Sequence, residues 1–295
     1  MIWWSIVFLA VFLIGVTKSG FGSGVGLMVV PMTAIAMGHI PGRGSESALG
    51  LLLPLLIAGD LIAVWQYSHL FFAKYPRAAQ PIGAGASFSP DDPEIEPQHV
   101  QARAVIRRLM PGTIVGVVLG GLLLAWLRFH ANLVGALIRI EIGWESILLV
   151  SIHWWRIYRG VQQRLLPEPW RSGITGGFAA VSSTLAHAAG PIIAMYLLPL
   201  RLDRQLYVAT SAVYFFLLNS AKLPAYYASG LFAHAAVSFT IRLLPLVIGG
   251  AIFGRWLNKR LSDLLFTKIV YIVTFALGCY ILTDGILRLF GRHIA

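Results

Sequence analysis

Charged residues are scarce in this sequence. Only 12% of the 295 residues are Asp, Glu, Lys or Arg, and 57% are hydrophobic. The mean hydropathy is +0.75. Because a soluble domain carries about 25% charged residues, this composition excludes an ordinary soluble enzyme or binding module and indicates a polytopic membrane protein.

Cysteine and acidic residues are also scarce. The single Cys279 lies in an apolar segment, which excludes a disulfide framework, a CxxC motif and a cysteine-based zinc cluster. Twelve acidic residues face 23 basic ones, and the net charge is +11 at pH 7. The basic residues lie in short loops between apolar runs, where the positive-inside rule explains them better than nucleic-acid binding. We expect no cofactor, no metal site and no nucleic-acid partner.

Apolar runs are abundant. The first twenty residues lack the charged start and the cleavage site of a signal peptide, and Trp3 and Trp4 suit a membrane-interface anchor. We therefore predict a transmembrane helix there. Apolar segments lie near 3–17, 27–40, 48–66, 106–127, 133–155, 172–186, 190–200, 205–221, 234–256 and 264–287. Several are shorter than the ~20 residues of a full crossing, which indicates half-helices or short tilted helices.

The segment count predicts five segments in each half of the chain. The runs LMPGTIVGVVLGG and LLPLVIGGAIFG share one proline–glycine spacing, with Pro111, Gly116 and Gly120 in the first and Pro245, Gly250 and Gly254 in the second. Five crossings per half place the halves in opposite orientation. The predicted fold is an all-α polytopic membrane protein with about ten transmembrane or half-membrane helices. They form two inverted repeats, 1–155 and 172–295.

The distribution of Lys and Arg predicts the orientation in the cytoplasmic membrane. Basic residues gather around 67–105, 156–171, 201–204 and 255–260 and are fewer in the loops between these regions. Loops 73–104 and 156–171 should therefore be cytoplasmic, with both termini outside. Residues 73–104 form the one long polar insertion, which is rich in Pro and Gly and should be solvated. Its acidic residues lack the spacing of an EF-hand: they are Asp91, Asp92, Glu94 and Glu96.

Two glycine- and hydroxyl-rich interruptions are the main functional signal. They are TKSGFGSGVGLMVVP (17–31) and SSTLAHAAGPIIAMYLLP (182–199). Such runs break a helix and free backbone N–H and C=O groups. In a bilayer this is tolerated only where the freed groups face protein or water. One break in each half is typical of the binding site of a secondary transporter.

The first break offers a cation and exposed backbone N–H groups to an anion. Its candidate anion-binding residues are Lys18, Ser19, Gly20, Gly22, Ser23 and Gly24. The structural alternative is a lysine that extends to the membrane interface beside a glycine-packed helix crossing.

The second break places hydroxyls beside a histidine. Ser182, Ser183, Thr184 and His187 lie in a stretch, 172–200, that contains no Asp, Glu, Lys or Arg. Ionisable groups inside a membrane are costly, and His187 titrates near neutral pH. The alternative is a neutral histidine bonded to a helix carbonyl, with the hydroxyls bonded to their own turn.

Isolated polar residues occur in three further apolar segments. Asn219 and Lys222 are three residues apart and share a helix face. Lys222 is a candidate site residue, although a helix ending near Pro224 would let it reach the interface. Asp60 is a candidate lysine partner or proton carrier. Another group is Glu141 and Glu145, with Arg139 nearby, for which we expect a structural ion-pair role.

These residues resemble those of the TauE/SafE family of sulfite and organosulfonate exporters. Residues 18–23 resemble its Lys-Gly-Gly-Phe-Gly-Gly-like signature, with serines at two of the glycines. Residues 183–191 resemble its Ser-Thr/Phe-Leu-x-His-x-Gly-Gly-Pro run, with Ala189 in place of the first glycine. The resemblance covers nearly the whole chain outside the polar insertion. It implies a membrane transporter of sulfur-containing anions.

We therefore expect a proton-coupled secondary transporter for a small sulfur oxyanion or sulfonate, and no enzyme activity. Lys18, Lys222 and two helix N-termini would compensate the charge of the anion. Hydroxyl and amide groups would replace its hydration: Ser23, Ser183, Thr184 and Asn219. His187 is the preferred proton-coupling group and Asp60 the second. The alternatives are a passive anion channel and an intramembrane hydrolase that uses Ser182 or Ser183 with His187. The expected partners are the anion and membrane lipid, and the oligomeric state stays open.

Overall fold

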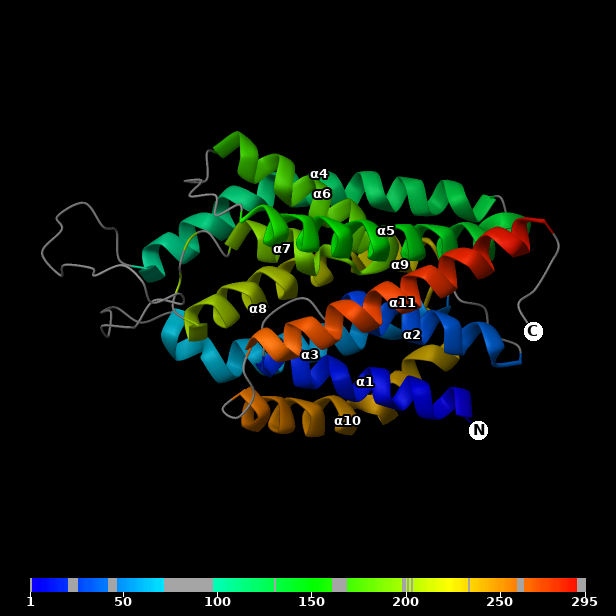
Figure 1. Ribbon diagram of the computed structural model, residues 1–295, viewed down its shortest axis with the longest axis horizontal. Coiled ribbons are helices and arrows are strands. Elements are labelled where there is room, and N and C mark those ends of the chain that lie inside the picture. Colours follow the sequence, from blue (N-terminus) through cyan, green and yellow to red (C-terminus); the bar gives the residue numbers. More distant parts are fainter. Residues whose placement is uncertain are drawn as a thin grey trace, which may run out of the picture.

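The computed structural model describes residues 2–20, 26–41, 47–71, 98–129, 131–160, 169–197, 200, 202, 204–232, 234–258 and 263–290. Over these residues it contains eleven α-helices and no strand, which confirms the all-α prediction (Figure 1). The helices are α1 (Ile2–Gly20), α2 (Gly26–His39), α3 (Ser47–Phe71), α4 (Gln98–Phe129), α5 (Ala131–Arg159), α6 (Pro169–Ala186), α7 (Ala189–Leu197), α8 (Arg204–Ala221), α9 (Leu223–Ala228), α10 (His234–Asn258) and α11 (Asp263–Leu289).

Several of these helices are long and apolar enough to cross a membrane. Among the described residues six such spans occur: Ile2–Gly20, Ser47–Ser68, Ala102–Leu127, Gln205–Ala228, Phe239–Leu257 and Tyr271–Leu289. The short helices α2 and α7, of 14 and nine residues, each follow one of the two predicted breaks. This pattern confirms a polytopic membrane protein that combines full-length and short helices.

One boundary differs from the sequence prediction. α4 begins at Gln98, so the end of the predicted polar insertion is helical, while residues 73–97 lie outside the described residues. α8 ends at Ala221, as the predicted apolar segment 205–221 does, and a short further helix, α9, follows Lys222. Pro224 explains the separation, because proline cannot continue a helix but fits its first turn. With α9, the described residues contain eleven helices, in agreement with the prediction of about ten.

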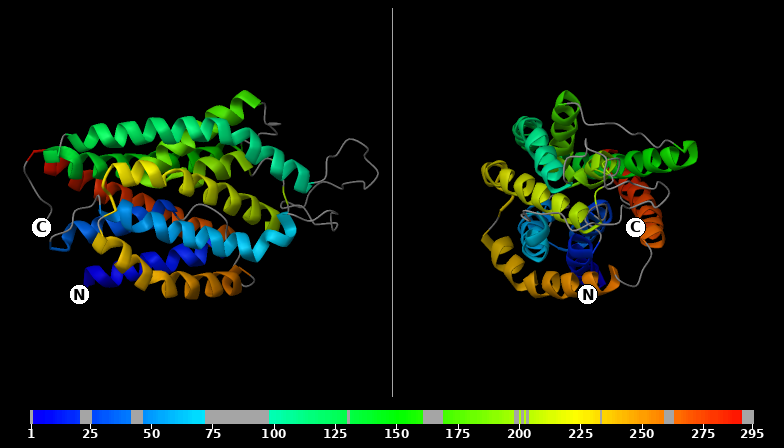
Figure 2. Two further views of the ribbon diagram at one scale, coloured as in Figure 1. Left: turned by 180° about the vertical axis from the view of Figure 1, so that it is seen from behind. Right: turned by 90° about the vertical axis from the view of Figure 1, so that its left-hand side faces the viewer.

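The helices pack in pairs that join distant parts of the chain. α1 packs on α10, α4 on α6, α5 on α11 and α3 on α8. The α1–α10 and α4–α6 pairs lie on opposite sides of the bundle, with α3 and α8 between them (Figures 1 and 2). α1 begins and α11 ends at the same end of the bundle. Side chains of α3, α8 and the α6–α7 break are thus held in the middle of the molecule.

Glycines let the two helices of each outer pair, α1–α10 and α4–α6, approach each other closely. A Cβ at Gly250 of α10 would overlap the backbone carbonyl of Phe12 in α1. A Cβ at Gly112 of α4 would overlap the carbonyl of Gly173 in α6. Such backbone contact is the usual role of glycine between membrane helices. In both pairs, the first predicted apolar segment of one half meets the fourth predicted segment of the other half.

Gly250 and its neighbour Gly249 provide a matched test of this packing. A Cβ at Gly249 would meet nothing within 4 Å. We expect Gly250→Ala to destabilise the fold by about 1 to 3 kcal/mol through overpacking, and Gly249→Ala to leave the stability near that of the wild type. Thermal unfolding of the purified protein in detergent measures both. Equal midpoints for the two variants would contradict the close α1–α10 contact.

Candidate functional site

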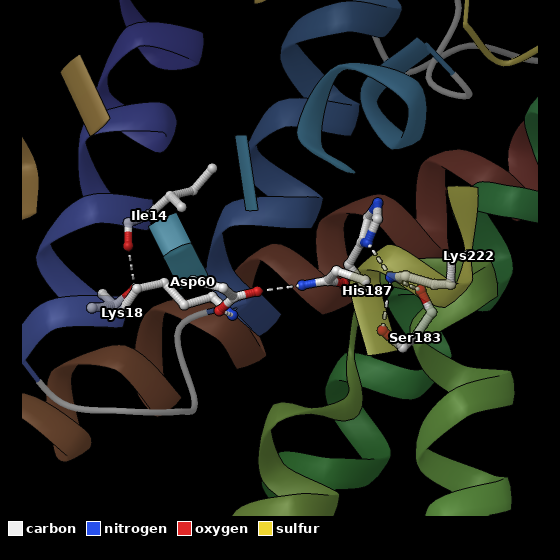
Figure 3. A network of polar contacts seen from close by, with 8 residues as sticks. Ile14, Lys18, Asp60, Ser183, His187 and Lys222 are labelled. Atoms are coloured by element: carbon white, nitrogen blue, oxygen red, sulfur yellow. Dashed lines mark hydrogen bonds and ion pairs between the residues drawn. The ribbon is translucent and has the colours of Figure 1, made fainter. Parts of the chain in front are cut away.

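Lys222 lies at the turn between α8 and α9, and its side chain is fully buried, with 0% exposure. Its Nζ donates to Ser183 Oγ at 2.9 Å, to the Ser183 carbonyl at 3.0 Å and to His187 Nδ1 at 2.9 Å (Figure 3). An ammonium group has three protons, so each finds an acceptor. The helix does end near Pro224, yet Lys222 does not extend to the interface.

The contact with Lys222 determines the protonation of His187. An ammonium group can only donate, so His187 Nδ1 must accept, and the ring proton lies on Nε2. That nitrogen lies 3.1 Å from the backbone carbonyl of Leu49, to which it donates. His187 is therefore neutral in this arrangement. Its backbone φ of +54° is in the left-handed region and marks the end of α6.

Side chains donate to two backbone carbonyl groups beside the α6–α7 break. The Tyr226 hydroxyl donates to the Thr184 carbonyl at 2.7 Å. The Ser183 carbonyl accepts from Lys222 as well as from the His187 backbone N–H, each at 3.0 Å. The Thr184 hydroxyl bonds to the Ala180 carbonyl of its own helix at 2.7 Å. The back-bonded threonine and the carbonyl-bonded histidine match the structural alternative, whereas the ammonium contact of His187 does not.

A second polar group includes Asn219 of α8, three residues before Lys222. Lys18 Nζ is 2.6 Å from Asp60 Oδ1, and Asn219 Nδ2 donates to Asp60 Oδ2 at 2.6 Å. Asp60 has 0% exposure, and the Lys18 side chain only 14%. Lys18 Nζ also lies 4.3 Å from the centre of the Phe215 ring. The expectation of a lysine partner for Asp60 is met by Lys18.

The two groups form one polar network inside the bundle. It consists of Lys18 from α1, Asp60 from α3, Ser183 and His187 from the α6–α7 break, and Asn219 and Lys222 from the end of α8. The spacing of Asn219 and Lys222 places one residue in each group. The Lys18–Asp60 pair is neutral. Among the described residues no carboxylate contacts Lys222. With both lysines protonated and Asp60 ionised, the network therefore carries one net positive charge.

The first break is described only up to Gly20. Ser19 is buried and its Oγ has no hydrogen-bond partner among the described residues, while its carbonyl accepts from the Tyr67 hydroxyl at 2.9 Å. Gly20 packs against the backbone of Gly254. Three candidates of this break lie outside the described residues: Gly22, Ser23 and Gly24. The expected approach of Ser23 to Thr184 stays a prediction for the same reason.

Arg139 of α5 pairs with a residue that is distant in sequence. It bonds to Asp284 of α11, which also accepts from Arg288 at 2.9 Å. Glu145 accepts a hydrogen bond from Ser182. The expected ion-pair role of Glu141 and Glu145 stays a prediction.

A serine–histidine pair is not formed in the described site. Ser182 is bonded to Glu145, and Ser183 faces the Lys222 ammonium. Both His187 ring nitrogens have other partners, so neither is placed to take a serine proton. A nucleophilic serine needs such a base within hydrogen-bonding distance.

Sequence reasoning missed two partners of His187. Tyr226 lies four residues after Lys222, and its hydroxyl is 3.4 Å from His187 Nε2. The four-residue spacing between Lys222 and Tyr226 could have indicated this contact, since residues four apart share a helix face. The Leu49 carbonyl is a backbone group of an apolar helix, and no sequence pattern distinguishes it.

Similarity to known proteins identifies the family of this chain. A family model described as Sulfite exporter TauE/SafE matches residues 97–281, more than half of the chain. The chain belongs to the TauE/SafE family. No curated protein and no solved structure matches it. The match to this transporter family includes the second break and Lys222, so the polar network lies partly within the TauE/SafE region.

Tyr226 and Tyr227 test whether side chains stabilise the break. Tyr226→Phe removes the donor to the Thr184 carbonyl and should lower stability by about 0.5 to 1.5 kcal/mol. Tyr227 is 80% exposed, so Tyr227→Phe is the matched control and should have no measurable effect. Unfolding midpoints in one detergent compare the two variants. A Tyr226→Phe protein as stable as the control would show that the hydroxyl contributes nothing to the break.

Proposed function

We propose that this TauE/SafE protein is a secondary transporter that moves a small sulfur-containing anion, such as sulfite or an organosulfonate, across the cytoplasmic membrane. The observation that carries the proposal is the Lys222 ammonium, which is fully buried and contacts no carboxylate among the described residues. A charge inside a membrane protein is costly unless it is paired. An anionic substrate would supply the missing partner.

The network also contains the hydrogen-bond donors that an oxyanion requires. In place of its present acceptors, Lys222 would donate to the substrate, and the Ser183 hydroxyl beside it would turn its proton in the same direction. Lys18 and the Asn219 amide, which both contact Asp60, would approach the same anion. Charge-assisted hydrogen bonds of this kind are shorter and stronger than neutral ones.

Burial of the network favours a transporter over a channel. Asp60, Ser183, Asn219 and Lys222 are all nearly inaccessible to solvent. A channel needs a continuous path for the ion, whereas a transporter opens a closed site to one side at a time. Saturable uptake would support the transporter, and uptake that rises linearly with concentration would favour the passive channel.

Two further features belong to the same proposal. The halves 1–155 and 172–295 would form inverted repeats, which the reciprocal packing of α1 on α10 and α4 on α6 supports. Loops 73–104 and 156–171 would face the cytoplasm, as the positive-inside rule predicts. The proton gradient would supply the energy for substrates whose binding takes up a proton. A hydrolase finds no support in the contacts of Ser182 and Ser183.

Replacement of Lys222 tests the anion site. Lys222→Met keeps the length of the side chain and removes the charge, so the protein should fold but bind sulfite at least about 100-fold more weakly, the loss expected for one buried charge partner. Lys268 of α11 is exposed, and Lys268→Met is the matched control. Isothermal titration of the purified proteins with sulfite and with a sulfonate measures both.

A folded Lys222→Met protein that binds both anions with the affinity of the control would exclude Lys222 from the site. Uptake into proteoliposomes, saturable in the wild type and lost in the variant, would join binding to transport.

A further inference from the structure

We propose that Asp60 acts as an internal counter-ion for Lys18, so that the site takes a monoanion as it stands and takes a dianion together with one proton on Asp60. This inference rests on the proposed function and names the charge class of its substrate. It follows from the ion pairs of the network and their burial.

The first step is the charge of the network with Asp60 ionised. Lys18 and Asp60 are 2.6 Å apart and cancel each other. His187 is neutral because Nδ1 accepts from Lys222 and Nε2 donates to the Leu49 carbonyl. One positive charge remains, on Lys222, and it balances one negative charge on the substrate.

The second step concerns a substrate with two negative charges. A dianion would leave one uncompensated charge in a buried site, which is strongly unfavourable. Protonation of Asp60 removes the carboxylate charge, releases Lys18 and gives the site two positive charges. Each dianion would therefore bind with one proton, and the proton gradient would drive dianions but not monoanions.

The surroundings of Asp60 fit this role. Two cations act on it: Lys18 of α1 in direct contact, and Lys222 at the end of α8 at longer range. The amide of Asn219 holds the other carboxylate oxygen at 2.6 Å. Among the described residues of α2, α4 and α10, which pack near α3, no charged side chain contacts the carboxylate. Asp60 is thus the one carboxylate of the network, and a proton on it changes the charge of the whole site.

His187 is less suited to carry this proton. A proton on Nδ1 would place a second positive charge 2.9 Å from Lys222 Nζ and would remove one of its three acceptors. A proton on Nε2 is already present and is shared with the Leu49 carbonyl. The contacts therefore favour Asp60 over His187 as the carrier of the coupled proton, although the sequence analysis preferred His187.

Two anions with fixed charge test the proposal on the wild-type protein. Thiosulfate carries two negative charges and isethionate one between about pH 6 and pH 8, so any pH dependence there belongs to the protein. The affinity for thiosulfate should rise by up to about tenfold for each unit that the pH falls, the limit for one linked proton. The affinity for isethionate should stay constant. In weak buffer, thiosulfate binding should take up close to one proton and isethionate binding none.

Asp60→Asn completes the test, since it mimics the protonated carboxyl. It should bind thiosulfate with an affinity that does not depend on pH and that exceeds the wild-type affinity at pH 8 by at least about tenfold. Glu145→Gln, the same change at a carboxyl outside the network, should keep the wild-type pH dependence.

The outcomes separate the two proposals. If the wild-type protein binds neither anion, the proposed transport function fails. If it binds both and thiosulfate affinity does not change with pH, or if Asp60→Asn keeps the pH dependence, only the role of Asp60 is overturned. The wild-type measurements decide this even where the variant does not fold.

Discussion

The structure depends on the placement of one ammonium group in an apolar interior. Transfer of a lysine to the centre of a membrane helix costs about 3 kcal/mol or more. Lys222 offsets part of this cost with three acceptors, one from its neighbour His187 and two from Ser183. All three acceptors lie where α6 ends at Ala186, and the Ser183 carbonyl accepts from the His187 backbone N–H as well as from Lys222. The end of α6 therefore supplies the hydrogen-bond partners of the buried lysine.

The rest of the fold holds this arrangement in place. α3 supplies the Leu49 carbonyl that orients His187, and it also supplies Asp60. α8 carries Asn219 near its end and leads directly into Lys222, and so it connects the two polar groups. The glycine-packed pairs α1–α10 and α4–α6 lie on either side of these central helices.

Most of the helices and several residues of the polar network could be predicted from the sequence, whereas the pairing of those residues could not. The helices, the second break and the isolated residues Asp60 and Lys222 were visible because polar groups stand out in apolar segments. Their pairing was not, since it depends on how distant helices pack: Lys18 meets Asp60, and His187 meets Lys222. Arg139 illustrates the same limit. Its nearest acidic residues in sequence suggested a pair, but its partner Asp284 lies on a helix near the end of the chain.

The central claim, that Lys222 provides the charge that holds the substrate, is tested most directly by locating an anion in the protein. Selenite is a close analogue of sulfite, and its selenium can be located by anomalous diffraction. The account predicts a selenium peak whose oxygens lie within hydrogen-bonding distance, about 3 Å, of Lys222 Nζ. Selenite bound elsewhere, with Lys222 still bonded to Ser183 and His187, would contradict it.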